Sequence, residues 1–292
     1  PVALISAVDT AVCEGNAVVL KLDSASGPGP YTLVVGGQTY TGVNVGDQFA
    51  TLHPLEKSIW DTTGTPAETN HNAGTATELG VKFRSSVAGY VKGIRFYKGA
   101  TNTGTHTGTL WSSTGTQLAT ATFTSESDSG WQAVRFSTPV FIQANTTYIA
   151  SYSSPNGVYA LTTGGFTSAA VVNGPLTALQ SGTDGPNGVL LTGTGFPSAG
   201  TSDNYWVDVL FESAQTSAQS VNIKLTSITN GNGCTSAGDS LTSATVTVNA
   251  LPDGTIAAAT ATTCNSSNMS LVFTASNGVG PYTLVINDST YS

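Results

Sequence analysis

The strongest constraint on the fold of this chain is an internal repeat with a spacing of 251 residues. Residues 30–35 read PYTLVV, and residues 281–286 read PYTLVI. The same spacing relates Cys13 to Cys264, and no gap is needed between these matches. Because each repeat of such an array is one structural unit, we expect the chain to hold one full period and the beginning of the next. We therefore also expect it to be a piece of a longer protein.

Short apolar segments recur along the chain and predict β-strands. They are rich in β-branched and aromatic residues, and clusters of Gly, Asn, Asp, Ser and Pro separate them at intervals of about 8–12 residues. Examples are residues 17–23, 31–37, 79–85, 89–99, 131–137, 146–154, 205–213 and 243–250. No stretch has a sustained helical periodicity. The pattern is typical of β-sandwiches and predicts an all-β fold.

Charged residues are scarce, at 9% of the chain, whereas an average soluble protein has about 25%. The 9 Lys and Arg residues face 17 Asp and Glu residues, and the formal net charge is -8. So few scattered cations cannot displace counterions from nucleic acid phosphates. No apolar run reaches the roughly 18 residues of a membrane-spanning helix. We therefore expect neither a nucleic acid partner nor a membrane span in this segment.

The repeat also predicts how the chain is divided into domains. Residues 1–52 and 215–250 each hold only about three predicted strands, and neither part is long enough to bury a sandwich core alone. We predict that they form one β-sandwich, and that residues 53–214 are a second β-sandwich inserted into one of its loops. Residues 251–292 then start the next repeat. The alternative is a row of three small consecutive domains.

The chain has three cysteines, Cys13, Cys234 and Cys264, and none lies in a C-x-x-C motif. No histidine lies near them, which argues against a zinc site. If Cys13 pairs within its own repeat, Cys234 is the only candidate, and Cys264 then needs a partner in the next repeat. We predict this disulfide. The alternative is three buried free thiols, which behave as small hydrophobic side chains.

The outer parts of the chain carry the motifs of a known type of repeat. The matching strings are V-C-E-G-N (12–16), G-P-Y-T-L-V-V (29–35), L-T-S-I-T-N-G-N-G-C (225–234) and S-A-T-V-T-V-N (243–249). They resemble the Ig-like, PKD-like repeats of large secreted surface proteins of Bacteroidetes. The resemblance implies an Ig-like β-sandwich in which Cys13 and Cys234 bridge the two sheets.

The middle of the chain resembles a different family. The matching strings are E-L-G-V-K-F (78–83), G-Y-V-K-G-I-R-F-Y-K-G (89–99), G-W-Q-A-V-R-F-S-T-P-V (130–140), T-T-Y-I-A-S-Y (146–152) and N-Y-W-V-D-V-L-F (204–211). They are similar to a bacterial domain of unknown function that occurs beside Ig-like modules. The resemblance implies a jelly-roll-like sandwich, similar to carbohydrate-binding modules, with a role in surface binding but no defined ligand.

Two loops of the middle part contain the candidate ligand-binding residues. The candidates are His106, Asn102, Tyr159 and Asn156, together with Trp60. Exposed aromatic rings stack on sugar faces, and nearby amide and imidazole groups bind sugar hydroxyls. The alternative is that the aromatic rings belong to the core. No G-x-S-x-G motif occurs and the acidic residues are spread thinly, so we predict no enzymatic activity.

Calcium is the expected metal, because Ca²⁺ binds six to eight carboxylate and carbonyl oxygens. Glu78 precedes the first predicted strand of the middle part, while Asp203 and Asp208 lie at its last strand. First and last strands of jelly-roll binding modules are often neighbours, so a structural ion can bridge them. The alternative is that these acids are solvated surface groups.

These observations predict a role rather than a reaction. We expect a non-catalytic repeat segment of a secreted bacterial cell-surface adhesin or extracellular filament that displays a binding module. Its expected partners are neighbouring repeats, other copies of the chain through strand addition, and a glycan ligand. The alternative is a carbohydrate-binding accessory region of a secreted polysaccharide-degrading enzyme.

Overall fold

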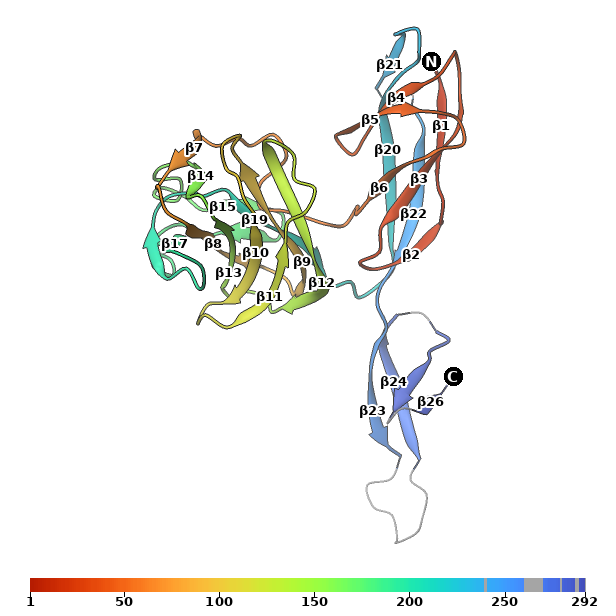
Figure 1. The fold of residues 1–292 in the computed structure, drawn as a ribbon. Coiled ribbons are helices and arrows are strands. Elements are labelled where there is room, and N and C mark those ends of the chain that lie inside the picture. Colours follow the sequence, from red (N-terminus) through yellow and green to blue (C-terminus); the bar gives the residue numbers. More distant parts are fainter. Residues whose placement is uncertain (239–240, 260–269, 279, 287–288, 292) are drawn as a thin grey trace. The chain divides into compact units, whose positions relative to one another are not determined.

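The computed structural model describes residues 1–238, 241–259, 270–278, 280–286 and 289–291. This part of the chain contains strands and no helix, which confirms the predicted all-β fold. Accordingly, the described ranges contain no helix that is long and apolar enough to cross a membrane. The chain divides into two compact units, one formed by Pro1–Pro54 with Gln215–Ser292 and the other by Leu55–Ala214. We call them the host unit and the inserted unit (Figure 1).

Two sheets form the complete copy of the repeat in the host unit. The first has the order β1 (Ala3–Ala7), β3 (Val18–Ala25), β6 (Gln48–Leu52). The second has the order β2 (Ala11–Cys13), β22 (Ser243–Asn249), β20 (Gln219–Thr229), β4 (Tyr31–Val35), β5 (Gln38–Val43), and β21 (Thr235–Ala237) pairs with β20. The second sheet therefore joins strands from both sides of the insertion, and Figure 1 shows β20, β22 and β4 side by side.

Alternating burial along the strands builds the core of the host unit. Val18, Leu20 and Leu22 of β3 are buried, and the side chains between them are partly exposed. Successive residues of a strand point to opposite faces, so one face is apolar. Leu33 of β4 and Val246 of β22 belong to the same buried cluster as these side chains. The two sheets therefore pack face to face as a sandwich, and each fully buried side chain of this size contributes roughly 1.5–3 kcal/mol.

The point of insertion lies where two host segments meet. Leu52 and Pro54, which precede the inserted unit, line the same surface hollow as Val221 and Lys224, which follow it. The two ends of the host chain are therefore close together. This closeness allows a domain to be placed in the loop without pulling the host strands apart.

The inserted unit contains a large sheet, a three-stranded sheet and a small two-stranded sheet. The strands of the large sheet follow the order β11 (Gln117–Thr122), β10 (Thr107–Ser112), β13 (Tyr148–Ser154), β8 (Thr77–Ser85), β16 (Leu176–Ala178), β15 (Val171–Asn173). In addition, β17 (Gly188–Thr192) pairs with β8. The short strand β18 (Ala199–Thr201) pairs with β17. The three-stranded sheet has the order β12 (Gly130–Ile142), β9 (Gly89–Lys98), β19 (Val207–Ser213). The two-stranded sheet pairs β14 (Val158–Leu161) with β7 (Glu68–Asn72).

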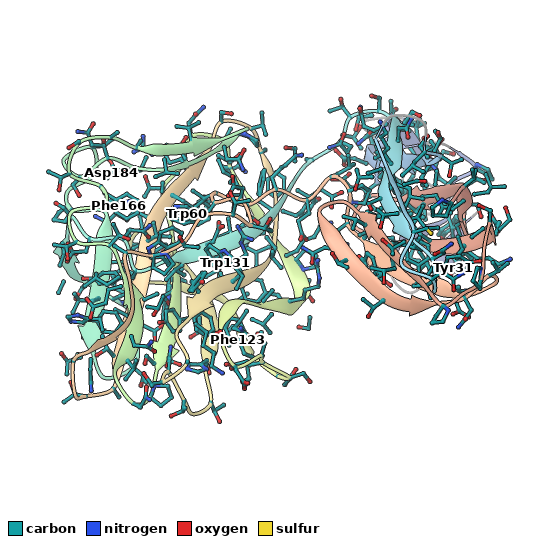
Figure 2. All side chains as sticks on the ribbon, turned by 90° about the horizontal axis from the view of Figure 1, so that it is seen from above. Tyr31, Trp60, Phe123, Trp131, Phe166 and Asp184 are labelled. Carbon is teal, nitrogen blue, oxygen red and sulfur yellow. The ribbon has the colours of Figure 1, made fainter. Side chains whose placement is uncertain are left out.

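The core of the inserted unit lies between the large sheet and the three-stranded sheet. Phe83 of β8 and Tyr152 of β13 come from the large sheet, and Phe96 of β9 and Phe211 of β19 come from the three-stranded sheet; all are buried in one cluster. Tyr152 stacks on Phe96 with the ring centroids 4.0 Å apart. The inserted unit is therefore also a β-sandwich, with an aromatic-rich interior (Figure 2).

The two ends of the inserted unit pair with each other. The N–H of Lys57 donates to the carbonyl of Phe211 over 2.7 Å, and the N–H of Phe211 donates back to Lys57 over 2.9 Å. The chain thus enters and leaves the inserted unit at neighbouring positions. Its compact-unit boundaries, at residues 54/55 and 214/215, lie beside the boundaries expected from the sequence.

The second copy of the repeat reproduces much of the strand register of the first. Its described strands are β23 (Asp253–Ala258), β24 (Leu271–Asn277), β25 (Leu284–Ile286) and β26 (Ser289–Tyr291). The matching pairs are Ile5↔Leu22 with Ile256↔Phe273, Ala7↔Leu20 with Ala258↔Leu271, and Leu33↔Tyr40 with Leu284↔Tyr291. Each of these pairs is displaced by the 251 residues found in the sequence, so both copies form the same two antiparallel strand pairs at these positions. The registers differ at the beginning of the first pair, where Leu4 pairs with Ser24 but Thr255 pairs with Thr274.

The predicted disulfide between Cys13 and Cys234 is wrong, because the two residues lie at opposite ends of one sheet. Cys13 pairs with Asn249 at one end of β22. Cys234 follows the far end of the neighbouring strand β20, which is 11 residues long. Such a strand spans roughly 30 Å, whereas a disulfide requires Cα atoms within about 7 Å. Both thiols are free and exposed, and Cys264 lies outside the described residues.

Residues 55–214 expressed alone are expected to fold and to unfold cooperatively, because the core and the paired ends of this unit are internal to it. Circular dichroism during thermal unfolding checks this. The matched control is the chain with residues 55–214 replaced by a short Gly-Ser linker, which is expected to retain a folded host unit. Absence of a cooperative transition in the isolated inserted unit contradicts the prediction.

Candidate functional site

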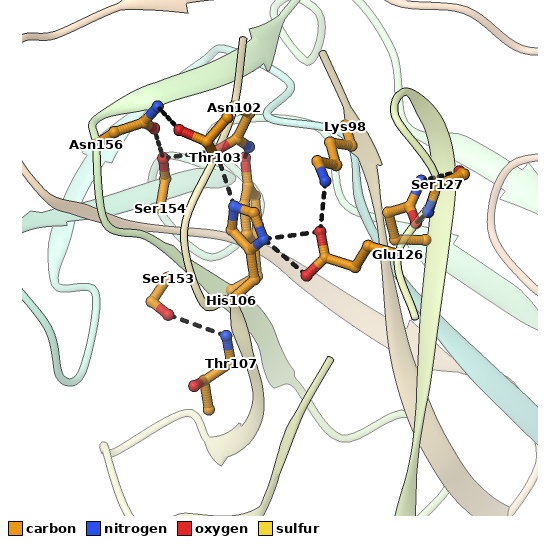
Figure 3. Close-up of polar contacts among 12 residues, drawn as sticks. Lys98, Asn102, Thr103, His106, Thr107, Glu126, Ser127, Ser153, Ser154 and Asn156 are labelled. Atoms are coloured by element: carbon orange, nitrogen blue, oxygen red, sulfur yellow. Dashed lines mark hydrogen bonds and ion pairs between the residues drawn. The ribbon is translucent and has the colours of Figure 1, made fainter. Parts of the chain in front are cut away.

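His106 and Asn102, predicted to contact a ligand, are fully buried. His106 Nε2 lies 2.8 Å from Asn102 Oδ1, and its Nδ1 lies 2.8 and 2.9 Å from the two carboxylate oxygens of Glu126. Lys98 Nζ approaches the same carboxylate at 2.9 Å (Figure 3). Both ring nitrogens of His106 are therefore occupied within the protein. The prediction of a ligand contact is wrong for these two residues, which instead anchor the loop to the sandwich.

The other two predicted loop residues also hold the structure together. Asn156 Nδ2 donates to the carbonyl of Thr101 at 2.8 Å and to Thr103 Oγ1 at 3.1 Å, which joins the two loops. Tyr159 lies in β14 and is buried, and its ring packs edge-on against Tyr205 at 5.7 Å. The two predicted loops are therefore adjacent, as a ligand rim requires, but most of their polar groups serve to fasten them.

Trp60 belongs to an aromatic cluster and does not form an exposed stacking surface. It is 8% exposed and stacks on Trp131 at 6.5 Å, with Trp206 at 5.9 Å. The guanidinium carbon of Arg95 lies 4.2 Å from the centre of the Trp131 ring, which is a cation–π contact. Figure 2 shows Trp60 and Trp131 in the inserted unit. Trp60 is therefore a core residue, as the alternative interpretation of the sequence proposed, and does not present a surface for sugar stacking.

Asp208 is the centre of a buried ion pair. It is fully buried, and its carboxylate accepts hydrogen bonds from Arg95 Nε at 2.9 Å and from Arg95 Nη2 at 2.6 Å. The N–H groups of Ile59 and Trp60 donate to it at 2.7 and 3.1 Å. Burial raises the pKa of Asp208, while Arg95 and these N–H groups oppose the rise. Asp208 thus fastens the segment that begins the inserted unit to its last strand.

The structure does not assemble the predicted calcium site of Glu78, Asp203 and Asp208. Val207 and Val209 face the core, so Asp208 points outward from the three-stranded sheet, whereas Glu78 points outward from the large sheet on the other side of the sandwich. Asp203 accepts a hydrogen bond from the N–H of Gly164 at 2.7 Å. In the described part of the chain, no three His, Cys, Asp or Glu side chains form a group that suits a metal.

A polar hollow on the outer face of the large sheet is the best candidate for a functional site. Its volume is about 300 Å³. The residues that line it come from four strands and one loop: Glu78 of β8, Thr107, Thr109 and Trp111 of β10, Gln117 and Thr120 of β11, Ser153 of β13, and Thr194 and Gly195 of the loop after β17. We call it the Glu78 hollow.

Glu78 is the ionisable group of this hollow. Leu79 beside it faces the core, so Glu78 points to the outer face, yet it is only 4% exposed because the loop after β17 covers it. The Ser151 hydroxyl and the N–H of Gly195 donate hydrogen bonds to its carboxyl group. Burial nevertheless outweighs these two donors and raises the pKa of Glu78 to about 7. No ion pair to Glu78 is found among the described residues.

Three features hold the hollow in shape. The Trp111 indole N–H donates to Ser151 Oγ at 2.8 Å, which turns the hydroxyl proton of Ser151 toward Glu78. Gly195 has a φ of 132°, a region that favours glycine, so the loop can turn its N–H toward the carboxyl group. Phe196 packs edge-on against Trp111 at 5.7 Å and fixes this loop on the sheet.

Sequence reasoning named Glu78 as a calcium ligand and missed its neighbours in the hollow. Thr107, Thr109 and Trp111 alternate with Gly108 and Leu110 in the sequence, so they share one face of a strand. The sequence therefore predicts that two hydroxyls and an indole share one face of this strand. It does not predict that they lie beside Glu78, because β10 and β8 are neighbours only through β13.

Substitution Asp208→Asn is expected to destabilise the inserted unit by about 3–5 kcal/mol, because it leaves the buried Arg95 charge without its partner. Urea unfolding of residues 55–214 measures the loss. The control is Asp128→Asn at an exposed position, for which little change is expected. A loss below about 1 kcal/mol for Asp208→Asn argues against a structural role for the ion pair.

Glu78 is expected to make the stability of the inserted unit depend on pH. Its folded pKa of about 7 lies above the ordinary value of 4.5, so the folded state holds a proton that the unfolded state releases. The resulting stabilisation is complete below pH 4.5 and is lost as pH rises through 7, to a total of roughly 3 kcal/mol. The free energy of unfolding of wild type minus that of Glu78→Gln is expected to fall between pH 5 and 8. Parallel pH profiles contradict this assignment.

A comparison with known protein families also separates the region that contains this hollow from the rest of the chain. No curated protein matches the chain. A family model described as "Domain of unknown function (DUF4082)" matches residues 63–207. This range lies within the inserted unit and includes all the strands that line the Glu78 hollow. Most of the inserted unit is therefore similar to a domain family whose description assigns it no function.

Proposed function

We propose that this chain is a non-catalytic repeat segment of a secreted bacterial cell-surface adhesin or extracellular filament. In this proposal an Ig-like sandwich displays an inserted, jelly-roll-like binding module. The observation that carries it is the matching strand pairs of the two copies, such as Ile5↔Leu22 and Ile256↔Phe273, which lie 251 residues apart. A repeated sandwich with few charges suits an extended array, whose stability is roughly a sum over its modules and their contacts.

The form of the insertion supports a display role. The ends of the inserted unit pair through Lys57 and Phe211, and the host segments that flank it line a common hollow. A module connected in this way interrupts the host without separating its sheets. Such an arrangement lets a repeat carry a binding surface while the host strands continue the array.

The second copy of the repeat supports neighbouring repeats or other copies as partners. Ile5 is 2% exposed, but its equivalent Ile256 is 48% exposed; Leu20 is fully buried, but its equivalent Leu271 is 46% exposed. In the complete copy, Leu225 of β20 and Val246 of β22, from the facing sheet, belong to the buried cluster that covers Ile5 and Leu20. Strands of this kind, from a neighbouring repeat or another copy, are the partners that these apolar side chains fit.

A second candidate function is a carbohydrate-binding accessory region of a secreted polysaccharide-degrading enzyme. The observation that favours it is the Glu78 hollow, because hydroxyl, amide and carboxyl groups beside an indole ring are the groups that bind sugars. This role shares the binding module with the first proposal. It differs in that the module serves an enzyme rather than an array.

Electron microscopy of the intact protein from its native source separates the two proposals. An adhesin or filament is expected to appear as a rod with evenly spaced lateral domains, because in this proposal each 251-residue period carries an inserted unit like Leu55–Ala214. An accessory region is expected to appear as a compact enzyme with one or a few appended modules. A glycan array probed with residues 55–214 tests the binding role in both cases, and an array without binding argues against the second proposal.

A further inference from the structure

We propose that the Glu78 hollow is a binding site for a neutral, hydroxyl-rich ligand the size of one sugar residue. The inference rests on the proposed role of the inserted unit as a binding module. It adds the chemical class of the ligand and the residues that contact it.

The chemistry of the lining selects hydroxyl groups. Hydroxyl or amide side chains make up most of the lining: Thr107, Thr109, Gln117, Thr120, Ser153 and Thr194. Hydroxyl and amide groups both donate and accept hydrogen bonds, as sugar hydroxyls do. Such a lining matches a ligand that carries donors and acceptors on the same atoms. Several lining residues, including Gln117, Thr120 and Thr194, are exposed, so a ligand reaches the hollow directly from solvent.

Glu78 supplies a fixed polar anchor at the buried end of the hollow. Its carboxyl group receives the Ser151 hydroxyl and the Gly195 N–H, whereas a carboxyl group has about four acceptor positions. Acceptor capacity therefore remains for a ligand hydroxyl. Because Trp111 and Ser151 hold the carboxyl group in place, little side-chain entropy is lost when a ligand binds.

Size and shape agree with a single sugar residue. The volume of about 300 Å³ lies at the lower end of small-molecule sites, which span roughly 300–1,000 Å³. Trp111 contributes only a small apolar part of the lining, because it is 8% exposed and Phe196 packs against it. A polar lining with a small apolar part is thus matched by a sugar, which has hydroxyls at its rim and C–H groups on its faces.

The same lining disfavours charged ligands. No Lys, Arg or His side chain is among the residues that line the hollow, so an anion finds no opposite charge. A calcium ion binds six to eight oxygens, several of them usually carboxylates, and Glu78 is the one carboxyl group among the lining residues. A neutral polyol is the class that remains.

Nuclear magnetic resonance of the full ¹⁵N-labelled chain tests the inference. The probes are glucose, galactose, mannose and N-acetylglucosamine, each titrated to millimolar concentrations. At least one probe is expected to shift the Trp111 indole N–H and Gly195 amide resonances saturably, because Trp111 and Gly195 line the hollow and hydrogen-bond with the Ser151–Glu78 pair. Calcium chloride and inorganic phosphate are titrated in parallel, and neither is expected to shift them.

Three variants identify the site of binding. Thr194→Trp places a large ring in the hollow from an exposed loop position, and it is expected to abolish the sugar-dependent shifts. Thr120→Val removes one hydroxyl and is expected to weaken binding roughly fivefold or more. Thr177→Val is the matched control, because Thr177 lies on β16 of the same sheet, away from the hollow, and it is expected to leave binding unchanged.

The inference is overturned if no probe shifts these resonances, if calcium or phosphate shifts them in place of the sugars, or if Thr194→Trp binds as well as wild type. Its failure is distinguishable from failure of the proposed function. If residues 55–214 bind a glycan array and the Thr194→Trp variant binds it equally, the binding role stands and the Glu78 hollow is the wrong site. If the intact protein is also not an array in electron microscopy, the proposed function fails independently.

Discussion

The buried carboxylate of Asp208 closes the inserted unit, and the insertion depends on that closure. It binds Arg95 of the central strand β9 and the N–H groups of Ile59 and Trp60 at the beginning of the unit. The adjacent Lys57–Phe211 pairing places the two ends next to each other. A buried charge is costly unless it is paired and hydrogen-bonded, so separation of either end exposes an uncompensated group. This penalty keeps the ends together and leaves the host sheets intact.

Three buried polar centres of the inserted unit differ in how their charge is compensated. Asp208 faces Arg95, and His106 faces Glu126, so both are satisfied within the protein. Glu78 receives only neutral donors, and burial raises its pKa. Compensated pairs of this kind serve the fold, whereas a buried acid without an ion-pair partner beside an accessible hollow is a candidate for a functional site. This contrast is why the Glu78 hollow, and not the His106 loop, is the candidate site.

The errors of sequence reasoning have specific physical causes. Cys13 and Cys234 lie in the same compact unit, but counting residues gave no information about which end of a sheet each occupies. The loop around His106 reads as an exposed, polar loop, yet Glu126, distant in sequence, draws the imidazole inside. Trp60 was predicted to bind a ligand because it is aromatic, but the sequence did not show that Trp131 and Trp206 pack against it. Each error concerns a partner that lies far along the chain.

The sequence by itself determined the all-β fold, the alternation that makes one face of each strand apolar, and the repeat with its spacing of 251 residues. The first two features follow from local backbone geometry, because successive side chains of a strand point to opposite faces wherever the strand lies. Only the tertiary structure decided which polar side chains are buried and which residues meet at the Glu78 hollow. Those outcomes depend on the order of strands in the sheets, which brings Glu78, Trp111 and Ser151 together from three separate segments.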